Sequence, residues 1–159
     1  MAKMWAGRTA GVTDPVADDF NSSIRFDSRM YREDITGSMA HAAMLGAQHI
    51  LPQADADAII DALQGILDDI DHGALTFDPA CEDIHMFVEA ELTSRIGDVG
   101  KKLHTARSRN DQVLVDLKLF LRDELRQTAD AVKTLFDRLQ GLSEQYKEVL
   151  MPGYTHLQI

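Results

Sequence analysis

The feature that most constrains the fold is an unbroken helical pattern of apolar residues that runs from residue 110 to residue 150. The side chains of the stripe recur every three or four positions, and all but Thr128 are apolar: Leu114, Leu117, Leu121, Leu125, Thr128, Val132, Leu135, Leu139, Leu142, Tyr146 and Val149. This spacing predicts one amphipathic helix, and about 40 residues at 1.5 Å each make it about 60 Å long. A helix of that length outspans a small domain, so its apolar stripe needs further helices or other subunits to cover it.

The preceding residues carry shorter helical patterns. Apolar residues mark a loose helix over 28–50, a second helix follows Pro52 and ends at Gly73, and Asp78 and Pro79 are placed as N-cap and first residue of a third that runs to Gly97. Residues 1–20 have no sustained period and predict an extended arm. We therefore predict an all-α fold. Residues 1–109 form a small N-terminal helical domain with that arm, and residues 110–159 form the first long helix of an oligomeric helical bundle.

Composition narrows the function classes. The net charge is -10, from 26 acidic and 16 basic residues, which argues against nucleic acid as a partner. The single cysteine, Cys81, fits a reducing compartment. No apolar run reaches the roughly 18 residues of a membrane span, and the first residues lack a signal-peptide core. The prediction is a cytoplasmic protein with no membrane partner.

A dense polar cluster, GKKLHTARSRNDQ at residues 100–112, precedes the long helix. Its cations are Lys101, Lys102, Arg107 and Arg109, and its neutral hydrogen-bonding residues are His104, Thr105, Ser108, Asn110 and Gln112. A helix N-terminus presents N–H groups and partial positive charge, so the cluster suits a carboxylate or phosphate. The alternative is a solvated basic turn with Ser108 or Asn110 as its N-cap.

Two smaller patterns also bear on chemistry. Ser23 and Asp27 lie in a short polar segment flanked by apolar residues, where Asp27 either binds a ligand or caps the following helix. Glu82, His85 and Glu89 share one helical face, which fits a metal half-site or a row of surface ion pairs. Because no second histidine lies near them in the sequence, we expect no metal.

Together with four other blocks, the polar cluster resembles the argininosuccinate lyases of the fumarase/aspartase superfamily. The blocks occur in the expected order, as FNSSIRFD at 20–27, DITGSMAH at 34–41, EDIHMFVE at 82–89 and MPGYTHLQ at 151–158. One departure is WAGRT at 5–9, where the family usually has WGGRF. That difference bears on how the N-terminal segment docks and not on the site residues.

The resemblance implies the reversible β-elimination of argininosuccinate to arginine and fumarate by a homotetramer, and we expect no cofactor. It assigns proton transfer to His156. It assigns substrate binding to Ser23, Asp27, His85, Ser108, Arg109, Asn110 and Thr155. In the family a further block, a flexible loop of GSSxMPxKxNP type, supplies a catalytic serine. That block is absent from this sequence, so we expect no activity from the chain alone.

Two alternatives remain at this stage. The chain could be a non-enzymatic helical oligomerisation module, as the delta-crystallins resemble this family while serving as structural lens proteins. It could also belong to another lyase of the superfamily that acts on a different succinyl compound. The RSRN wording at 107–110 favours argininosuccinate lyase over the latter.

Overall fold

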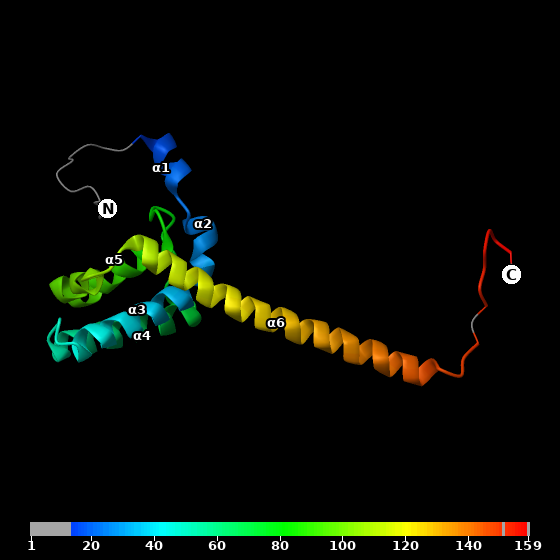
Figure 1. Ribbon diagram of the computed structural model, residues 1–159. Coiled ribbons are helices and arrows are strands. Elements are labelled where there is room, and N and C mark those ends of the chain that lie inside the picture. Colours follow the sequence, from blue (N-terminus) through cyan, green and yellow to red (C-terminus); the bar gives the residue numbers. More distant parts are fainter. Residues whose placement is uncertain (1–13, 151, 159) are drawn as a thin grey trace. The chain divides into compact units, whose positions relative to one another are not determined.

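The computed structural model describes residues 14–150 and 152–158, and these are helical apart from turns and one isolated bridge between Thr155 and Gln158 (Figure 1). The elements are α1 Pro15–Asn21, α2 Ile24–Asp27, the 3-10 helix η1 Ser28–Met30, α3 Tyr31–Ala47, α4 Gln53–Asp71, α5 Ile84–Ile96, the 3-10 helix η2 Gly97–His104 and α6 Arg109–Tyr146. The predicted all-α class is confirmed for the part of the chain that is described. None of the described helices has the length and apolar character to cross a membrane.

The chain divides into two compact units, residues 1–120 and residues 121–159. The long helix α6 has 38 residues and continues through the boundary between the units. The domain junction predicted between residues 109 and 110 stays a prediction.

The core of the first unit lies among α3, α4, α5 and η2. The apolar stripe of α4 faces this core while its aspartates face outward, as the sequence pattern predicts. The fully buried apolar residues among those described are Ile35, Ala42, Leu45, Ala56, Ile59, Leu63, Ile66, Ile84 and Leu92. Helices α3 and α4 approach closely at Gly46, where an added Cβ would lie 2.9 Å from the Cβ of Ala56. Any larger residue at this position would force the two helices apart.

Two predicted boundaries are wrong. Residues 15–20 form α1 instead of an extended arm, because the Asp14 side chain accepts a hydrogen bond from the Val16 N–H and Pro15 fits the first turn. Residues 1–13, the rest of the predicted arm, lie outside the described residues. The third helix begins at Ile84 and not at Pro79, because Asp83 is its N-cap and accepts from the Met86 N–H at 2.6 Å.

Candidate functional site

Ser108 is the N-cap of α6. Its hydroxyl accepts from the Asn110 N–H at 3.3 Å, and its own N–H donates to the Asp111 carboxylate at 3.1 Å. This reciprocal pair is a capping box in which aspartate takes the usual place of glutamate. Ala106, just before it, has a φ of 54° in the left-handed region. The backbone turn and the cap together fix where the helix begins.

Ser108→Ala should therefore lower the free energy of unfolding by about 1 kcal/mol, the usual cost of losing such a cap. Urea unfolding of the full chain, followed by circular dichroism, measures the change. Ser143→Ala is the matched control, because Ser143 is an exposed position inside the same helix. The control should be neutral or slightly stabilising, and equal effects of the two substitutions would show that Ser108 is not a cap.

The lysines of the polar cluster are paired with acids. The Lys101 ammonium lies 2.6 Å from Asp98, and the Lys102 ammonium lies 2.5 Å from Asp55. Arg107 is also engaged, and donates to the Ser38 hydroxyl at 2.9 Å. The cationic character expected from the sequence is therefore reduced at the two lysines, whereas the hydroxyl of Ser38 leaves the charge of Arg107 in place.

Arg109 differs from the two lysines because its carboxylate neighbours lie beyond hydrogen-bond distance. Its guanidinium lies 3.7 Å from Asp83 and 3.7 Å from Glu89, both on or next to α5. It donates one hydrogen bond, at 3.3 Å, to the Gln112 side chain. The two acids orient the guanidinium by charge, and a guanidinium has five N–H donors. The arrangement leaves Arg109 able to bind a ligand carboxylate in a bidentate manner.

Ser23 and the short helix α2, which ends at Asp27, are tied to the start of α5. The Ser23 hydroxyl donates to one Asp27 oxygen at 2.5 Å, and the other oxygen accepts from the Ile84 N–H at 3.2 Å. Asp27 therefore accepts the first N–H of α5, whose N-cap is Asp83, and its side chain does not cap the helix that follows it in sequence. Burial raises the pKa of Asp27, and the hydrogen bond from Ser23 opposes that shift. The backbone at the start of α2 adds two hydrogen bonds, from the N–H groups of Ser23 and Ile24 to the Glu82 carbonyl.

His85 is buried, with 1% of its surface exposed. Its Nδ1 lies 2.8 Å from Asp34 on α3 and 3.4 Å from Asp116 on α6. The Gln112 side chain also donates to Asp34, at 2.5 Å. Burial alone would lower the pKa of His85, but the hydrogen bond and the charge of Asp34 raise it. In this chain the imidazole contacts buried acids, so direct contact between His85 and a substrate stays a prediction.

The buried set of Asp34, His85 and Asp116 is also the one group of described residues whose metal-ligand atoms lie close together, all within 4.8 Å. His85 Nδ1 lies within hydrogen-bond distance of both carboxylates, which is the geometry of a proton-linked cluster. The row proposed from the sequence, Glu82, His85 and Glu89, does not converge, because Glu89 faces His104 at 2.8 Å instead. The absence of a metal stays a prediction.

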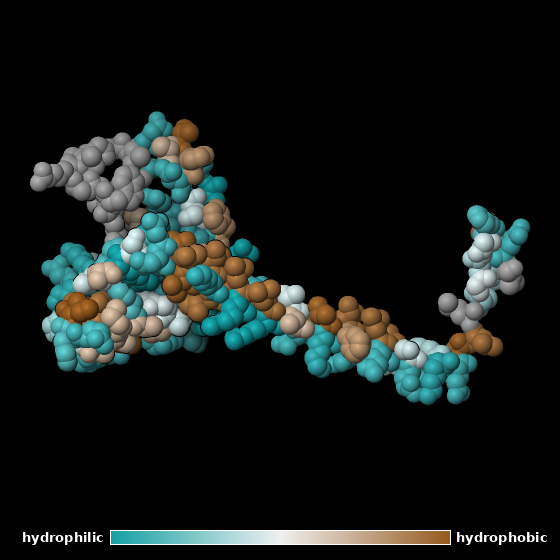
Figure 2. Space-filling model, in the orientation of Figure 1, coloured by the Kyte–Doolittle hydropathy of each residue, from teal (hydrophilic) through white to brown (hydrophobic). Residues whose placement is uncertain are grey.

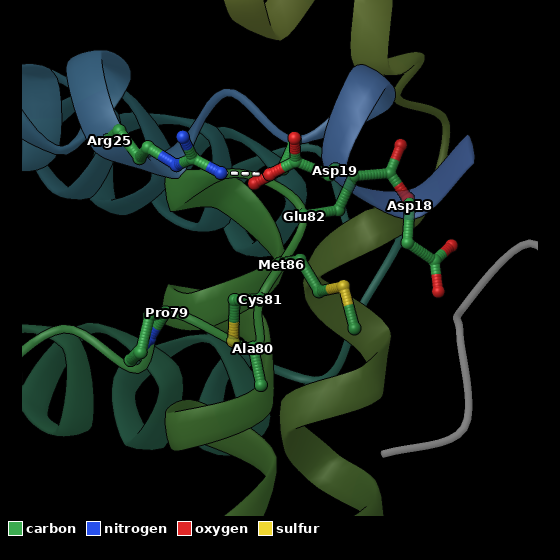
Figure 3. A pocket seen from close by; sticks show the side chains of 9 residues that line it. Asp18, Asp19, Arg25, Pro79, Ala80, Cys81, Glu82 and Met86 are labelled. Carbon is green, nitrogen blue, oxygen red and sulfur yellow. Dashed lines mark hydrogen bonds and ion pairs between the residues drawn. The ribbon is translucent and has the colours of Figure 1, made fainter. Parts of the chain in front are cut away.

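A cavity of about 420 Å³ is lined by side chains of residues 18–25 and 79–86, and Figure 3 shows them. Its acids, Asp18, Asp19 and Glu82, outnumber its one cation, Arg25, which is paired with Asp19. None of the predicted site residues lines it. An acidic cavity of this kind does not suit a dicarboxylate.

Thr155 and His156 lie in the second unit, in a tight turn. Thr155 and Gln158 exchange backbone hydrogen bonds of 2.8 and 2.9 Å around the two central residues. Those residues, His156 and Leu157, both have positive φ, at 48° and 61°, as a type I′ turn requires. Non-glycine residues rarely adopt this conformation, and strained positions of this kind cluster at functional sites. The side chain of His156 is exposed at the tip of the turn.

Comparison with known proteins identifies the family. A family model described as Lyase matches residues 7–159. The chain belongs to this lyase family. It is 54% identical over 156 residues to argininosuccinate lyases of Heliobacterium mobile and of Ruminiclostridium cellulolyticum, and 50% identical to that of Pelobacter propionicus. Each alignment covers 98% of this chain and 34% of the relative, so the chain spans about a third of the length of these proteins.

The resemblance predicted from the sequence blocks is thus confirmed: this lyase-family chain is homologous to the N-terminal part of argininosuccinate lyases. Of the predicted site residues, Ser23, Asp27 and His85 meet at the start of α5 or beside it, and Arg109 reaches the same helix. The roles assigned to these residues stay predictions.

Sequence reasoning missed two members of the buried cluster in this lyase-family chain. Asp34 lies in the block DITGSMAH, which contributes to the resemblance but carries no predicted role, and Asp116 lies inside the long helical pattern. A signal was present for the second, because Asp116 is the one acid in the strongly apolar run from 113 to 121. An acid in such a run is either exposed or bound to a partner.

Proposed function

We propose that this chain contributes two parts of the active site of an argininosuccinate lyase, which reversibly eliminates fumarate from argininosuccinate and leaves arginine. The observation that carries the proposal is the start of α6, where Ser108, Arg109 and Asn110 lie at a capped helix N-terminus. A guanidinium oriented by Asp83 and Glu89 stands there beside the exposed side chains of Ser108 and Asn110. Identity of 50% or more to argininosuccinate lyases supports this choice of reaction.

The chemistry requires removal of a proton from a carbon next to a carboxylate. That proton becomes removable only when donors stabilise the negative charge that develops on the carboxylate. Arg109, Asn110 and the first N–H groups of α6 are such donors, and Ser23 and Thr155 complete the grip on the succinyl part. Imidazoles titrate near neutral pH as a class, so His156 suits the proton transfer.

We also propose that the protein acts as a homo-oligomer, a tetramer as in the intact family. It would act in the cytoplasm and without a cofactor. The oligomer is supported by the second unit, where apolar side chains of α6 are exposed along the helix (Figure 2). A soluble monomer rarely exposes a continuous apolar row of this kind. A site assembled from several subunits would bring His156 of one copy to the α6 start of another.

The test is reconstitution. The purified chain alone should form no fumarate from argininosuccinate, because it spans about a third of the relatives. Co-expression with the remaining C-terminal part of the Heliobacterium mobile enzyme should restore elimination, detected by the ultraviolet absorbance of fumarate. The C-terminal part alone is the control. Activity of the chain by itself would contradict the shared site, and an inactive but well-assembled mixture would overturn the proposed reaction.

A further inference from the structure

Three helices of the first unit meet at buried ionisable side chains. Asp34 on α3, His85 on α5 and Asp116 on α6 have exposed fractions of 0%, 1% and 0%. His85 Nδ1 lies 2.8 Å from an Asp34 oxygen and 3.4 Å from an Asp116 oxygen. Because these three residues come from three separate helices, the cluster joins those helices to one another.

The hydrogen bonds of this cluster are incomplete unless it holds an extra proton. Both oxygens of Asp116 and one oxygen of Asp34 are buried with no donor. Two ionised carboxylates repel each other and cannot form a hydrogen bond, and leaving buried acceptors unpaired is costly. Asp34 and Asp116 lie within hydrogen-bond reach of each other, so one proton placed between them pairs one orphaned oxygen of each. With a protonated His85 and an ionised Asp34, the cluster then carries no net charge.

The neighbouring groups favour this distribution. Burial, and next the charge of Asp34, raise the pKa of Asp116 to about 8. Burial alone would raise the pKa of Asp34 too, but the hydrogen bond and the charge of His85 lower it. Asp116 is therefore the carboxyl that keeps the proton at neutral pH.

Other groups face the cluster from every side. Gln112 donates to Asp34. The positive charge of Arg107 opposes the upward shift in the pKa of Asp116, and that of Arg109 opposes the upward shift in the pKa of His85. Asp83, the N-cap of α5, acts in the opposite direction on His85. Burial and the negative charge of Asp34 still have the largest effects on the pKa of Asp116, and they raise it.

We propose that Asp116 is a positioning residue: it shares a proton with Asp34, and this buried bridge holds His85 and the first turns of α6 in place. Asp116 lies about two helical turns after Arg109, on the same side of the helix. The bridge thus fixes the residues that present Ser108, Arg109 and Asn110. Its importance for catalysis rests on the proposed function, whereas the bridge itself can be tested without any activity.

The substitution Asp116→Asn removes the titratable proton of this side chain but keeps its size. An asparagine amide can donate to Asp34 at every pH, as the protonated carboxyl does only below its pKa of about 8. A raised pKa in the folded state gives stability that is present at low pH and is lost as the pH rises toward about 8. Both proteins keep their other ionisable groups, so the difference between them isolates Asp116.

The measurement is urea unfolding of the full chain and of D116N from pH 5 to pH 9. Near pH 5 the two should be similarly stable. By pH 9 the ratio of folded to unfolded protein should be about tenfold or more higher in D116N than in the unsubstituted chain. D116A, which has no donor, should be less stable than D116N throughout. Asp130→Asn, an exposed site on the same helix, is the control and should leave the pH profile unchanged.

A second measurement keeps the proposal testable if a variant fails to fold. At pH 7 the infrared spectrum of the unsubstituted chain should contain the C=O band of a protonated carboxylic acid, which fades as the pH passes about 8. The band should be absent from D116N. Parallel pH profiles for D116N and the unsubstituted chain, absence of the band, or a stoichiometric divalent metal in the purified chain would each overturn the shared proton.

Discussion

Replacing His156 with asparagine is expected to lower the elimination rate of the reconstituted lyase by about 10²–10⁴-fold, the usual contribution of a positioned general acid or base. Asparagine tolerates the positive φ of 48° at this position, so the turn should survive. What is lost is the group that accepts or donates a proton. The effect should fall on kcat and leave KM nearly unchanged.

The matched control is Leu157→Asn, in the same turn and with a similarly positive φ of 61°. Its side chain is exposed and has no assigned role, so activity should stay within a few-fold of the reference. Both variants are assayed with the same C-terminal part, by fumarate absorbance under saturating argininosuccinate. A His156→Asn enzyme that keeps its kcat would remove His156 from proton transfer, and a rise in KM alone would place it in binding.

The long helix and α4 were predictable because local periodicity alone determines which of their faces is apolar. The start of α5 was not. Asp78 and Asp83 are both competent caps in sequence, and Asp78 does accept a hydrogen bond from the Ala80 N–H in a turn. The choice is made by a distant residue, since Asp27 accepts the first N–H of α5, that of Ile84, and so holds that helix start in place. No window of local sequence contains this contact.

In the candidate site, too, some features follow from the local sequence and others from contacts between distant residues. The cap at Ser108 is a local property and could be anticipated, although Asn110 was an equal alternative. The pairing of Lys102 with Asp55 and the meeting of Asp34 with His85 join residues far apart in sequence. These contacts decide which cations stay available and which histidine is buried. Of the cations in the cluster, Arg109 keeps its nearest carboxylates at 3.7 Å, a distance no sequence pattern specifies.

The apolar row of the second unit is the other feature with a large expected effect. Its side chains lie on one face of α6 at steps of three, four or seven residues, and their exposed fractions include 67% at Leu125 and 59% at Leu135. The row comprises Leu121, Leu125, Val132, Leu135, Leu139 and Tyr146. Fully burying one such aliphatic side chain contributes about 1.5–3 kcal/mol. Several together are enough to drive association of a second copy.

We therefore expect the purified chain to self-associate at micromolar concentration, and the double variant Val132→Glu, Leu139→Glu to be monomeric. Each substitution removes an apolar contact and places a charge in the interface, so the association constant should fall by about 10²-fold or more. Sedimentation equilibrium measures both. Asp130→Lys lies on the opposite face of the helix and changes charge without touching the row, so it should associate normally. A monomeric unsubstituted chain would mean that other polypeptide covers the row, while an associated double variant would place the interface elsewhere.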